Sequence, residues 1–421
     1  MPGPGSRLDD RLRAALAERQ ATGLRRSLRT LPTAGKYLTL DGRRLLNLAG
    51  NDYLGLSGHP DLADAAIRAV RDLGVGATAS RLVSGHLEVH EQAERDFACF
   101  KHAEAALLFP TGYTANLAVI SGLVRDRRDL VLQDRLNHAS LLDAARRCPA
   151  TVRTYAHLDP AKARRLLQRH RDQYPQAQRF LVTDTIFSMD GDVADLPQLC
   201  AICEATDTVL IVDEAHATGV LGATGAGLVE HQGVTGRVPV VVSTASKALG
   251  GLGGIVTGSQ ALIDYLINFA RPLIYSTAVP PAQAAVLSAA VARVRADAAT
   301  RSRLREVCCR VRVALRDAGW RLDDSAVPTP IVPLQVGDSR AALTLQRRLE
   351  DAGLLTVAIR PPTVPPGTAR VRLSLRADLD DAEVDRLLTA IGHPPSLVVH
   401  ENGVVAPTAA RAASSDGGGS R

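Results

Sequence analysis

The chain has 421 residues, 46% of them hydrophobic and only 3% aromatic, and its formal net charge is +6 at pH 7. This length can bury a full hydrophobic core, and it predicts a large domain with a smaller one. The arginines are dispersed through helical stretches and few aromatic side chains are available to stack on bases, so composition and charge argue against nucleic-acid binding.

No apolar run approaches the roughly 20 residues that span a bilayer, and the basic first 29 residues lack the apolar segment of a signal peptide. The six cysteines follow no disulfide spacing, which is typical of a reducing compartment. We therefore expect a cytoplasmic protein with no membrane partner. Cys200 and Cys203 have the spacing of half a zinc site, but no second pair completes four ligands. We predict that they pack in a helix and that the protein has no metal site.

The first predicted element is an amphipathic helix over residues 8–29, and a pair of strands follows over 36–49 with a turn at Asp41-Gly42. From about 60 to 290, helical stretches alternate with short strands, which we predict at 105–109, 130–133, 152–155, 180–185, 209–212 and 238–242. That alternation is typical of an α/β fold whose mostly parallel sheet is flanked by helices.

A long helical region then extends to about residue 317. Beyond it, strands alternate with two helices, and we place these strands at 331–336, 355–359 and 371–375. This pattern predicts a smaller α+β domain. The predicted division of the chain has four parts: an N-terminal helix and strand segment (1–57), the large domain (58–290), the C-terminal α+β domain (291–398) and a tail rich in Ala, Ser and Gly that we expect to be disordered (399–421).

Lysine is rare in this chain, because nearly all of the positive charge comes from arginine. The four lysines are Lys36, Lys101, Lys162 and Lys247. A lysine amine can form an imine with an aldehyde, whereas a guanidinium group stays protonated. Lys247 follows the predicted buried strand 238–242 after a turn of small residues. We therefore predict that Lys247 forms a buried Schiff base.

An acid and a histidine follow the predicted strand 209–212, at Asp213 and His216. In open α/β sheets, ligands bind at this end of the strands. Pyridoxal phosphate needs a carboxylate that keeps its ring nitrogen protonated, and Asp213 suits that role. His216 could reach the 3-oxygen of the ring. Together with Lys247, these residues predict pyridoxal 5′-phosphate as the cofactor.

A phosphate is expected where backbone amides open a helix, and Gly112 begins a helical pattern directly after the strand 105–109. An ordinary strand-to-helix turn is the alternative reading of this segment. The hydroxyl of Thr244 could add a further contact to the same phosphate. His138 follows the strand 130–133 and could stack on the pyridine ring and help a substrate carbonyl.

Six motifs in order connect these residues to a known family. They are NDYLGL (51–56), NHAS (137–140), FSMDGD (187–192), DEAH (213–216), SKALG (246–250) and RPPTVP (360–365). With them the chain resembles the α-oxoamine synthases, fold-type I pyridoxal-phosphate enzymes that condense an amino acid with an acyl thioester and release carbon dioxide. The segments 80–85 and 359–365 look like those of the 8-amino-7-oxononanoate synthases, which join L-alanine to a pimeloyl thioester in biotin biosynthesis.

The resemblance implies a role for each matching residue. The cofactor would be held by Lys247 as Schiff base, Asp213 at the ring nitrogen, His216 and Ser188 near the 3-oxygen, His138 over the ring, and Gly112, Tyr113 and Thr244 at the phosphate. The substrates would be held by Arg372 at the amino-acid carboxylate, by Asn51 and His138, and by Arg25 and Thr363 at the acyl group. Lys247, His138, Asp213 and His216 would be the catalytic residues. The resemblance also implies a homodimer with active sites at the subunit interface.

Two alternatives remain at this stage. A glycine-using α-oxoamine synthase, of the glycine C-acetyltransferase or 5-aminolevulinate synthase type, would keep every cofactor residue and change only the pocket. A noncatalytic partner subunit of the same fold would be expected to lack Lys247. The sequence also leaves open whether the pimeloyl group arrives on coenzyme A or on an acyl carrier protein.

Overall fold

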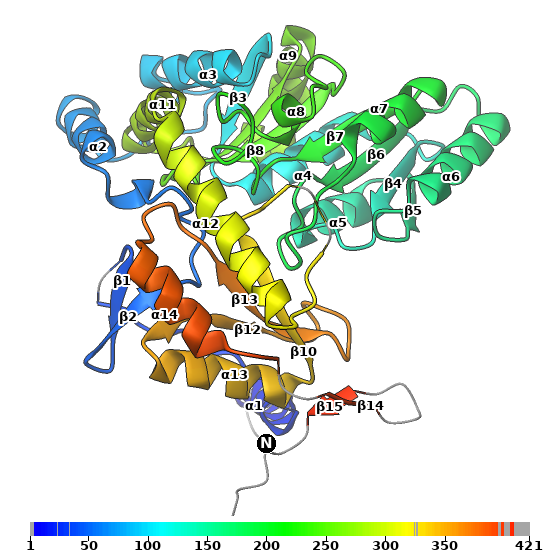
Figure 1. Cartoon of the computed structure of the whole chain (residues 1–421). Helices are drawn as coiled ribbons and strands as arrows, with labels where there is room; N and C mark the ends of the chain where they lie inside the picture. The colour runs from blue at the N-terminus through cyan, green and yellow to red at the C-terminus, as the bar shows by residue number, and fades with distance from the viewer. Residues whose placement is uncertain are drawn as a thin grey trace, which may run out of the picture. The chain divides into compact units, whose positions relative to one another are not determined.

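The computed structural model describes residues 4–22, 24–32, 34–323, 325, 327–394, 397–399 and 405–407 (Figure 1). The chain forms two compact units. The larger unit contains Leu48–Leu334 and Arg372–Pro394, and the smaller contains Met1–Asn47, Gln335–Val371 and Pro395–Arg421. None of the helices in the described part of the chain is long and apolar enough to cross a membrane.

A seven-stranded sheet forms the centre of the larger unit, with the order β3-β9-β8-β7-β6-β4-β5. Its strands are β3 (Ala105–Phe109), β4 (Leu130–Asp134), β5 (Thr151–Tyr155), β6 (Arg179–Asp184), β7 (Val209–Asp213), β8 (Val240–Thr244) and β9 (Gly254–Gly258). Strands β4 to β8 pair in parallel, and only β9 runs antiparallel to its neighbours β8 and β3. The predicted α/β fold with a mostly parallel sheet is confirmed, although β9 was not predicted.

Helices flank this sheet in the larger unit (Figure 1). The helices of the larger unit are α2 (Pro60–Leu73), α3 (Glu88–Phe100), α4 (Gly112–Leu123), α5 (Ala139–Arg147), α6 (Pro160–Gln173), α7 (Leu196–Ala205), α8 (Leu228–His231), α9 (Gln260–Phe269), α10 (Arg271–Ile274), α11 (Pro281–Ala296), α12 (Ala298–Asp317) and α14 (Asp381–Ile391), with a 3₁₀ turn, η1, at Leu56–Gly58. Of these, α12 and α14 pack on each other. Helix α11 packs on α2 and α3, and α4 packs on α5.

The central strands are apolar because both of their faces are buried, as is usual in a parallel sheet. Val182, Ile211 and Val240 occupy neighbouring positions on β6, β7 and β8, and they pack in one core cluster with Ala115 and Val119 of α4. In the same register Asp184 pairs with Asp213. The apolar pattern therefore brings the polar ends of these strands to one edge of the sheet.

The smaller unit begins with α1 (Pro4–Ala21) and the predicted hairpin of β1 (Tyr37–Leu40) and β2 (Arg43–Asn47). Asp41 and Gly42 both adopt positive φ, 49° and 75°, which suits a two-residue hairpin turn. The unit also contains α13 (Ser339–Asp351), β11 (Leu354–Leu355), β12 (Val357–Ile359) and the pair β14 (Leu397–Val399) and β15 (Val405–Pro407). A sheet of order β10-β13-β12 contains β10 (Ile331–Gly337) and β13 (Ala369–Ser374), each of which continues from one unit into the other.

Helix α1 is shorter at its C-terminal end than the predicted helix over 8–29. It ends at Ala21, because the backbone N–H of Leu24 donates to Arg19 O at 2.8 Å and the Thr22 hydroxyl donates to Glu18 O at 3.0 Å. These bonds satisfy the last carbonyls of the helix, as C-terminal caps do.

The compact units also divide the chain differently from the predicted segments 1–57, 58–290 and 291–398. Residues 291–334 group with the larger unit. Arg301 of α12 donates to Ala223 O at 2.8 Å, and Thr329 donates to Gly191 O at 2.6 Å, so this stretch is tied to loops of the large sheet. The tail predicted over 399–421 lies outside the described residues, except for the residues of β14 and β15.

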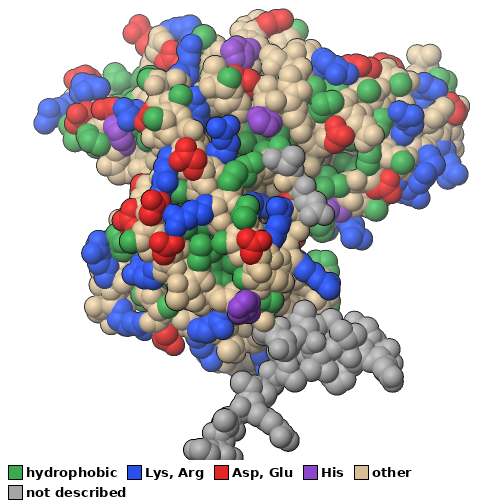
Figure 2. Space-filling model, in the orientation of Figure 1, with side chains coloured by type: hydrophobic (Ala, Val, Ile, Leu, Met, Phe, Trp, Pro, Cys, Tyr) green, Lys and Arg blue, Asp and Glu red, His purple; other side chains and the backbone are tan. Residues whose placement is uncertain are grey.

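The visible face of the molecule carries Lys and Arg side chains interspersed with Asp and Glu (Figure 2). This dispersion agrees with the arrangement of charge along the sequence. Cys200 and Cys203 are buried in α7, as predicted, and burial raises the pKa of the Cys203 thiol to about 12. No group of His, Cys, Asp or Glu side chains among the described residues is arranged to hold a metal ion.

Gly250 makes a close backbone approach in the turn that follows Lys247. Its φ is +68°, and a Cβ there would lie 2.6 Å from the backbone of Leu56 and Ser57. We expect Gly250→Ala to lower the free energy of unfolding by at least about 3 kcal/mol, because backbone strain and steric overlap add. Gly233→Ala is the matched control, since Gly233 has φ +65° and open space around it, and its cost should be only about 1–2 kcal/mol. Urea unfolding of both variants measures this difference, and equal costs would contradict it.

Candidate active site

The candidate active site lies where the parallel strands end. Asp213 is the last residue of β7, and its sheet neighbour Asp184 is the last residue of β6. Lys247 follows β8 after a short turn, and His138 caps helix α5 after β4. The carboxyl ends of parallel strands form the usual ligand-binding edge of an open α/β sheet.

A chain of close contacts links Lys247 to the segment around Tyr53. The Lys247 Nζ atom lies 2.7 Å from His216 Nε2, and His216 Nδ1 lies 2.7 Å from the Tyr53 hydroxyl. Tyr53 donates its hydroxyl proton to Asn51 Oδ1 at 3.2 Å. Because a hydroxyl has one proton, His216 Nδ1 is then the donor to Tyr53, and its Nε2 is an acceptor that faces Lys247.

Burial and neighbouring charges tune the two basic groups of this chain. Burial lowers the pKa of Lys247 to about 8, with Arg372 adding to the shift while Asp213 and Asp184 oppose it. Burial lowers the pKa of His216 well below its usual value, and Lys247 and Arg372 lower it further. The site therefore contains a neutral imidazole beside an amine that can lose its proton near neutral pH.

A second chain of hydrogen bonds links Asp213 to His138. The Asn116 amide donates to Asp213 Oδ2 at 2.6 Å and to Ser140 Oγ at 2.8 Å. Ser140 Oγ lies 2.7 Å from His138 Nδ1, which also accepts the Ser140 backbone N–H at 3.2 Å. His138 Nδ1 is thus an acceptor, and its proton is on Nε2.

His138 and Asp184 both favour their uncharged forms. Burial lowers the pKa of His138, against the opposing effect of Asp213. Burial and the nearby Asp213 carboxylate raise the pKa of Asp184 well above its usual value, although Asp184 also accepts the His138 backbone N–H at 2.6 Å.

The structure brings Gly112 and Thr244 together, as the sequence predicts for a phosphate site. A Cβ on Gly112 would lie 3.4 Å from Thr244 Cβ. Among the described residues, the backbone N–H groups of Gly112 and Tyr113 have no hydrogen-bond partner, and they open helix α4. Such a helix terminus attracts an anion. The Tyr113 side chain points elsewhere, because its hydroxyl donates to Asp143 Oδ2 at 2.5 Å, and the Thr244 hydroxyl donates to Gly253 O at 2.8 Å.

Arg372 is a buried arginine with an unpaired donor. It is 7% exposed, and its Nη2 donates to Asn51 Oδ1 and, at 3.2 Å, to Ser374 Oγ. Its buried Nε has no partner in the described part of the chain. An unpaired buried donor of this kind is costly unless a ligand accepts its hydrogen bond.

No hydrogen bond among the described residues joins Ser188, Arg25 or Thr363 to the site residues described above. Ser188 lies in the loop after β6. Arg25 and Thr363 belong to the smaller unit, where Arg26, which was not predicted, donates to Thr363 Oγ1 at 3.1 Å. Arg26 and Thr363 also line a cavity of about 230 Å³ with Arg360.

The chain is similar to known proteins in both sequence and fold. Residues 43–391 match the family described as aminotransferase class I and II. The 8-amino-7-oxononanoate synthase of Thioalkalivibrio sulfidiphilus is 46% identical over 384 residues, which cover 90% of this chain and 96% of the relative. The chain belongs to the 8-amino-7-oxononanoate synthase family.

Solved structures of the same fold agree with this assignment. The serine palmitoyltransferase of S. paucimobilis with bound PLP and myriocin superposes with a TM-score of 0.85 at 26% identity, covering 93% of this chain and 98% of that one. The 8-amino-7-oxononanoate synthase of Francisella tularensis gives a TM-score of 0.70 at 28% identity, covering 82% and 96%. The fold is that of the fold-type I pyridoxal-phosphate enzymes.

Pyridoxal 5′-phosphate is the cofactor of this family, and the residues present fit it. The half-buried Lys247 with its lowered pKa, the Asp213 carboxylate and the open N–H groups of Gly112 and Tyr113 supply the three kinds of contact that the cofactor needs. Asn116 Oδ1 is buried without a partner among the described residues, which leaves an acceptor in the same cluster.

Tyr53, Asn116, Ser140 and Asp184 are site residues that the sequence analysis did not identify. Tyr53 and Ser140 lie in motifs that it did recognise, at 51–56 and 137–140. Their contacts join positions far apart in the chain, such as Tyr53 with His216 and Asn116 with Asp213. The sequence does contain a signal for two of them: Asn116 is a polar residue within the mostly apolar helix α4, and Asp184 is an acid at the end of the apolar strand β6.

A buried ion pair supports the loop that carries Asp213 and His216. The Lys101 ammonium donates to Glu214 Oε2, to Ala226 O and, at 3.2 Å, to Thr218 Oγ1. The side chains of Lys101 and Glu214 are 4% and 0% exposed. The Glu214 carboxylate also accepts the backbone N–H of Val229 at 2.8 Å, so the pair ties three stretches of chain together.

Lys101→Met should lower the free energy of unfolding by about 3–5 kcal/mol, because it leaves the Glu214 charge buried without its partner. Arg95→Met is the control, since Arg95 pairs with Glu91 in solvent at 3.3 Å and should cost less than about 1 kcal/mol. Urea unfolding measures both values. The double variant Lys101→Met/Glu214→Leu should recover part of the loss; a double variant less stable than Lys101→Met would contradict the buried-charge explanation.

His157 links the carboxylates of Asp134 and Asp192, the second of which lies in the same loop as Ser188. Its Nδ1 lies 2.9 Å from Asp134 and its Nε2 lies 2.6 Å from Asp192, and its ring packs edge-on against Phe187 at 4.4 Å. Burial alone would lower the pKa of His157, but the hydrogen bonds to Asp134 and Asp192 outweigh it and raise the pKa to about 9.

This raised pKa predicts a pH-dependent contribution to stability. The stabilisation from protonated His157 is fully present below the unfolded pKa of about 6.5 and is lost as pH rises through about 9. His157→Gln should therefore cost up to about 3 kcal/mol at pH 6 and much less at pH 10. His170→Gln is the control. Burial lowers the pKa of His170, so its contribution to the free energy of unfolding should not change between pH 6.5 and 9, and the cost of this substitution should be constant there. Urea unfolding across this range measures both; a constant cost for His157→Gln would refute the assignment.

Proposed function

We propose that this protein condenses L-alanine with a pimeloyl thioester to give 8-amino-7-oxononanoate, carbon dioxide and the free thiol carrier, as a step of biotin biosynthesis. The observation that carries this proposal is the half-buried Lys247, whose amine lies beside His216 at the end of the parallel strands. Membership of the 8-amino-7-oxononanoate synthase family supports the choice of substrates. The pimeloyl carrier is coenzyme A or an acyl carrier protein, and the enzyme acts as a cytoplasmic homodimer.

Bound pyridoxal 5′-phosphate supplies an electron sink for the electrons released at the substrate α-carbon. Lys247 would hold the cofactor through its amine, and Asp213 would keep a proton on the ring nitrogen. Gly112 and Tyr113 would hold the phosphate with their backbone N–H groups. The Thr244 hydroxyl, which donates to Gly253 O, would turn to donate to the same phosphate. His138 would lie over the ring, and His216 and Ser188 would contact the 3-oxygen.

Lys247 Nζ is the base that takes the α-proton of alanine. Its pKa of about 8 lies close to the working pH, where a general base is most effective. The Nε2 of His216 accepts a hydrogen bond from this amine, so the free amine is oriented between proton transfers.

Arg372 holds the alanine carboxylate through the Nε and Nη groups of its planar fork. Asn51 fixes the position of this fork, since its side-chain oxygen accepts from Arg372 Nη2. The Nε2–H of His138 is free to donate to the thioester carbonyl or to the carboxylate that is lost. Arg25 and Thr363 bind the acyl group, and the contact of Arg26 with Thr363 adds Arg26 to this set.

The test is an assay of coenzyme release from pimeloyl-CoA by purified, cofactor-loaded protein, with L-alanine compared with glycine. Release should depend on alanine and should fall at least about 100-fold in Lys247→Ala, because the base is lost. Arg372→Lys should raise the KM for alanine more than it lowers kcat, since lysine lacks the bidentate fork.

The amino-acid comparison distinguishes the alternatives within the family. Faster turnover with glycine than with alanine would establish a glycine-using synthase instead. Failure to release coenzyme with either amino acid would count against pimeloyl-CoA as the donor, and a pimeloyl-acyl carrier protein would replace it in the same assay. Absence of the visible absorbance of bound cofactor would argue for a noncatalytic subunit.

A further inference from the structure

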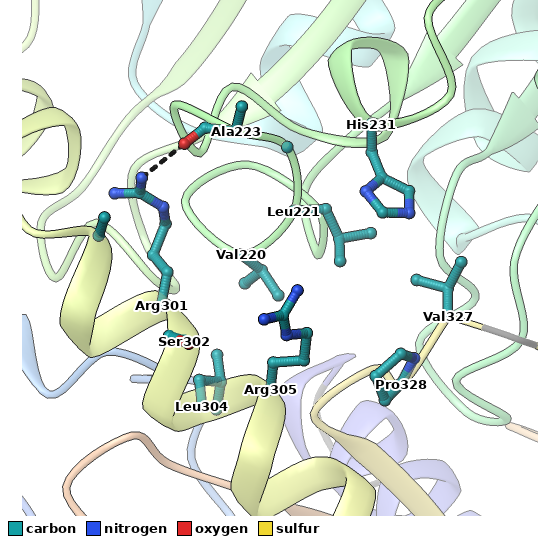
Figure 3. A pocket seen from close by; sticks show the side chains of 12 residues that line it. Val220, Leu221, Ala223, His231, Arg301, Ser302, Leu304, Arg305, Val327 and Pro328 are labelled. Atoms are coloured by element: carbon teal, nitrogen blue, oxygen red, sulfur yellow. Dashed lines mark hydrogen bonds between the residues drawn. The ribbon is translucent and has the colours of Figure 1, made fainter.

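A separate cavity of about 530 Å³ lies in the larger unit, between the turn at 220–223, helix α8 and the first turns of α12 (Figure 3). Its lining residues are Val220, Leu221, Gly222, Ala223, His231, Ala298, Arg301, Ser302, Leu304, Arg305, Val327 and Pro328. None of these residues belongs to the candidate active site. The volume lies in the range of small-molecule sites.

The described lining of this cavity is cationic. It includes two arginines and a histidine, and it contains no acidic side chain. Glu230, next to His231, directs its carboxylate to the backbone N–H groups of Thr224 and Ala226 instead. The positive charge in the cavity therefore has no carboxylate partner in its own wall.

Arg301 and Arg305 have different roles in this wall. Arg301 is 8% exposed, and its guanidinium donates only to backbone carbonyls, among them Ala223 O at 2.8 Å and Asp297 O at 3.2 Å. These bonds hold the turn against α12. Arg305 forms no hydrogen bond or ion pair with any described residue, and its guanidinium extends into the open space toward Val220 (Figure 3). Arg305 is also exposed to solvent, and it is thus available to a ligand at the open side of the cavity.

The other walls are apolar or weakly polar. Val220 and Leu221 lie beyond the tip of Arg305 (Figure 3), and Leu304, Val327 and Pro328 add further apolar side chains to the lining. Leu221 and Leu304 are 8% and 2% exposed. His231 faces this space from α8 (Figure 3). A ligand that fits this lining has one anionic group and a short hydrocarbon portion.

We propose that this cavity binds a short aliphatic carboxylate. The carboxylate accepts two parallel hydrogen bonds from Arg305, a geometry for which the guanidinium fork is suited. Ser302 and His231 border the same space, and the hydrocarbon chain covers Val220 and Leu221. Inorganic phosphate could satisfy Arg305 but would leave the apolar walls in water, so the carboxylate with a chain is the better match.

Two quantitative consequences follow from this geometry. Affinity should rise about two- to fourfold for each methylene from acetate to hexanoate, because each one removes apolar surface from water. Loss of the charged fork should weaken hexanoate binding at least about tenfold, which is the usual effect of losing a charge-assisted hydrogen bond.

Isothermal titration of the full-length, cofactor-loaded protein with hexanoate tests the proposal. Arg305→Gln removes the charge, and Ser302→Trp fills the cavity while Arg305 is kept; both should abolish or strongly weaken binding. Arg169→Gln is the matched control, because Arg169 is an exposed arginine on α6 and should leave binding unchanged. Thermal melting tests whether each variant is folded. If Arg305→Gln does not fold, the loss of hexanoate binding in Ser302→Trp tests the proposal.

Three results would overturn the proposal: no binding of hexanoate to the parent protein, equal binding in both cavity variants, or equal affinity for hexanoate and 1-hexanol. Phosphate binding that is lost in Arg305→Gln while hexanoate does not bind would replace the carboxylate with a phosphate ligand. Neither cavity variant touches the candidate active site, so alanine-dependent coenzyme release should be unchanged in both. Failure of this inference is thereby distinguished from failure of the proposed function.

Discussion

The in-register parallel pairing of β6, β7 and β8 is the constraint on which the rest of the structure depends. Asp184 pairs with Asp213, and Asp213 pairs with Val242 two residues before the end of β8. A shift of one residue would exchange the two faces of a strand and move its acid away from this edge. Because the strands are buried on both faces, the sheet is apolar inside and concentrates its chemistry at the strand ends.

Burial at this edge of the sheet shifts the pKa values of its polar groups. Burial lowers the pKa of Lys247 and His216 and raises the pKa of Asp184. Glu214, which supports the fold beside this edge, is paired with Lys101. Arg372 Nε and Asn116 Oδ1 of the site are buried without a partner among the described residues, and in the proposed function a ligand would supply the partner of Arg372.

Loops around the site are held by contacts that lie away from the chemistry. Lys101 ties the loop of His216 to the chain near Ala226, and His157 links Asp192 of the next loop to β4. The same region continues into the turn at 220–223, which Arg301 fixes against α12. The turn at 220–223 also lines the cationic cavity. The loops that support the site therefore form part of the wall of a second, chemically distinct cavity.

The sequence by itself determined the alternation of helices and strands, the parallel sheet, and the positions of Lys247, Asp213 and His216 just after strands. These features depend on local apolar patterns and on motifs within a few residues, which a linear reading captures. The tertiary structure alone decided the contacts of Tyr53 with His216 and of Asn116 with Asp213, which cross 163 and 97 residues. It also decided the antiparallel strand β9 and the cavity beside Arg305, because packing between distant elements, and no local pattern, specifies both of them.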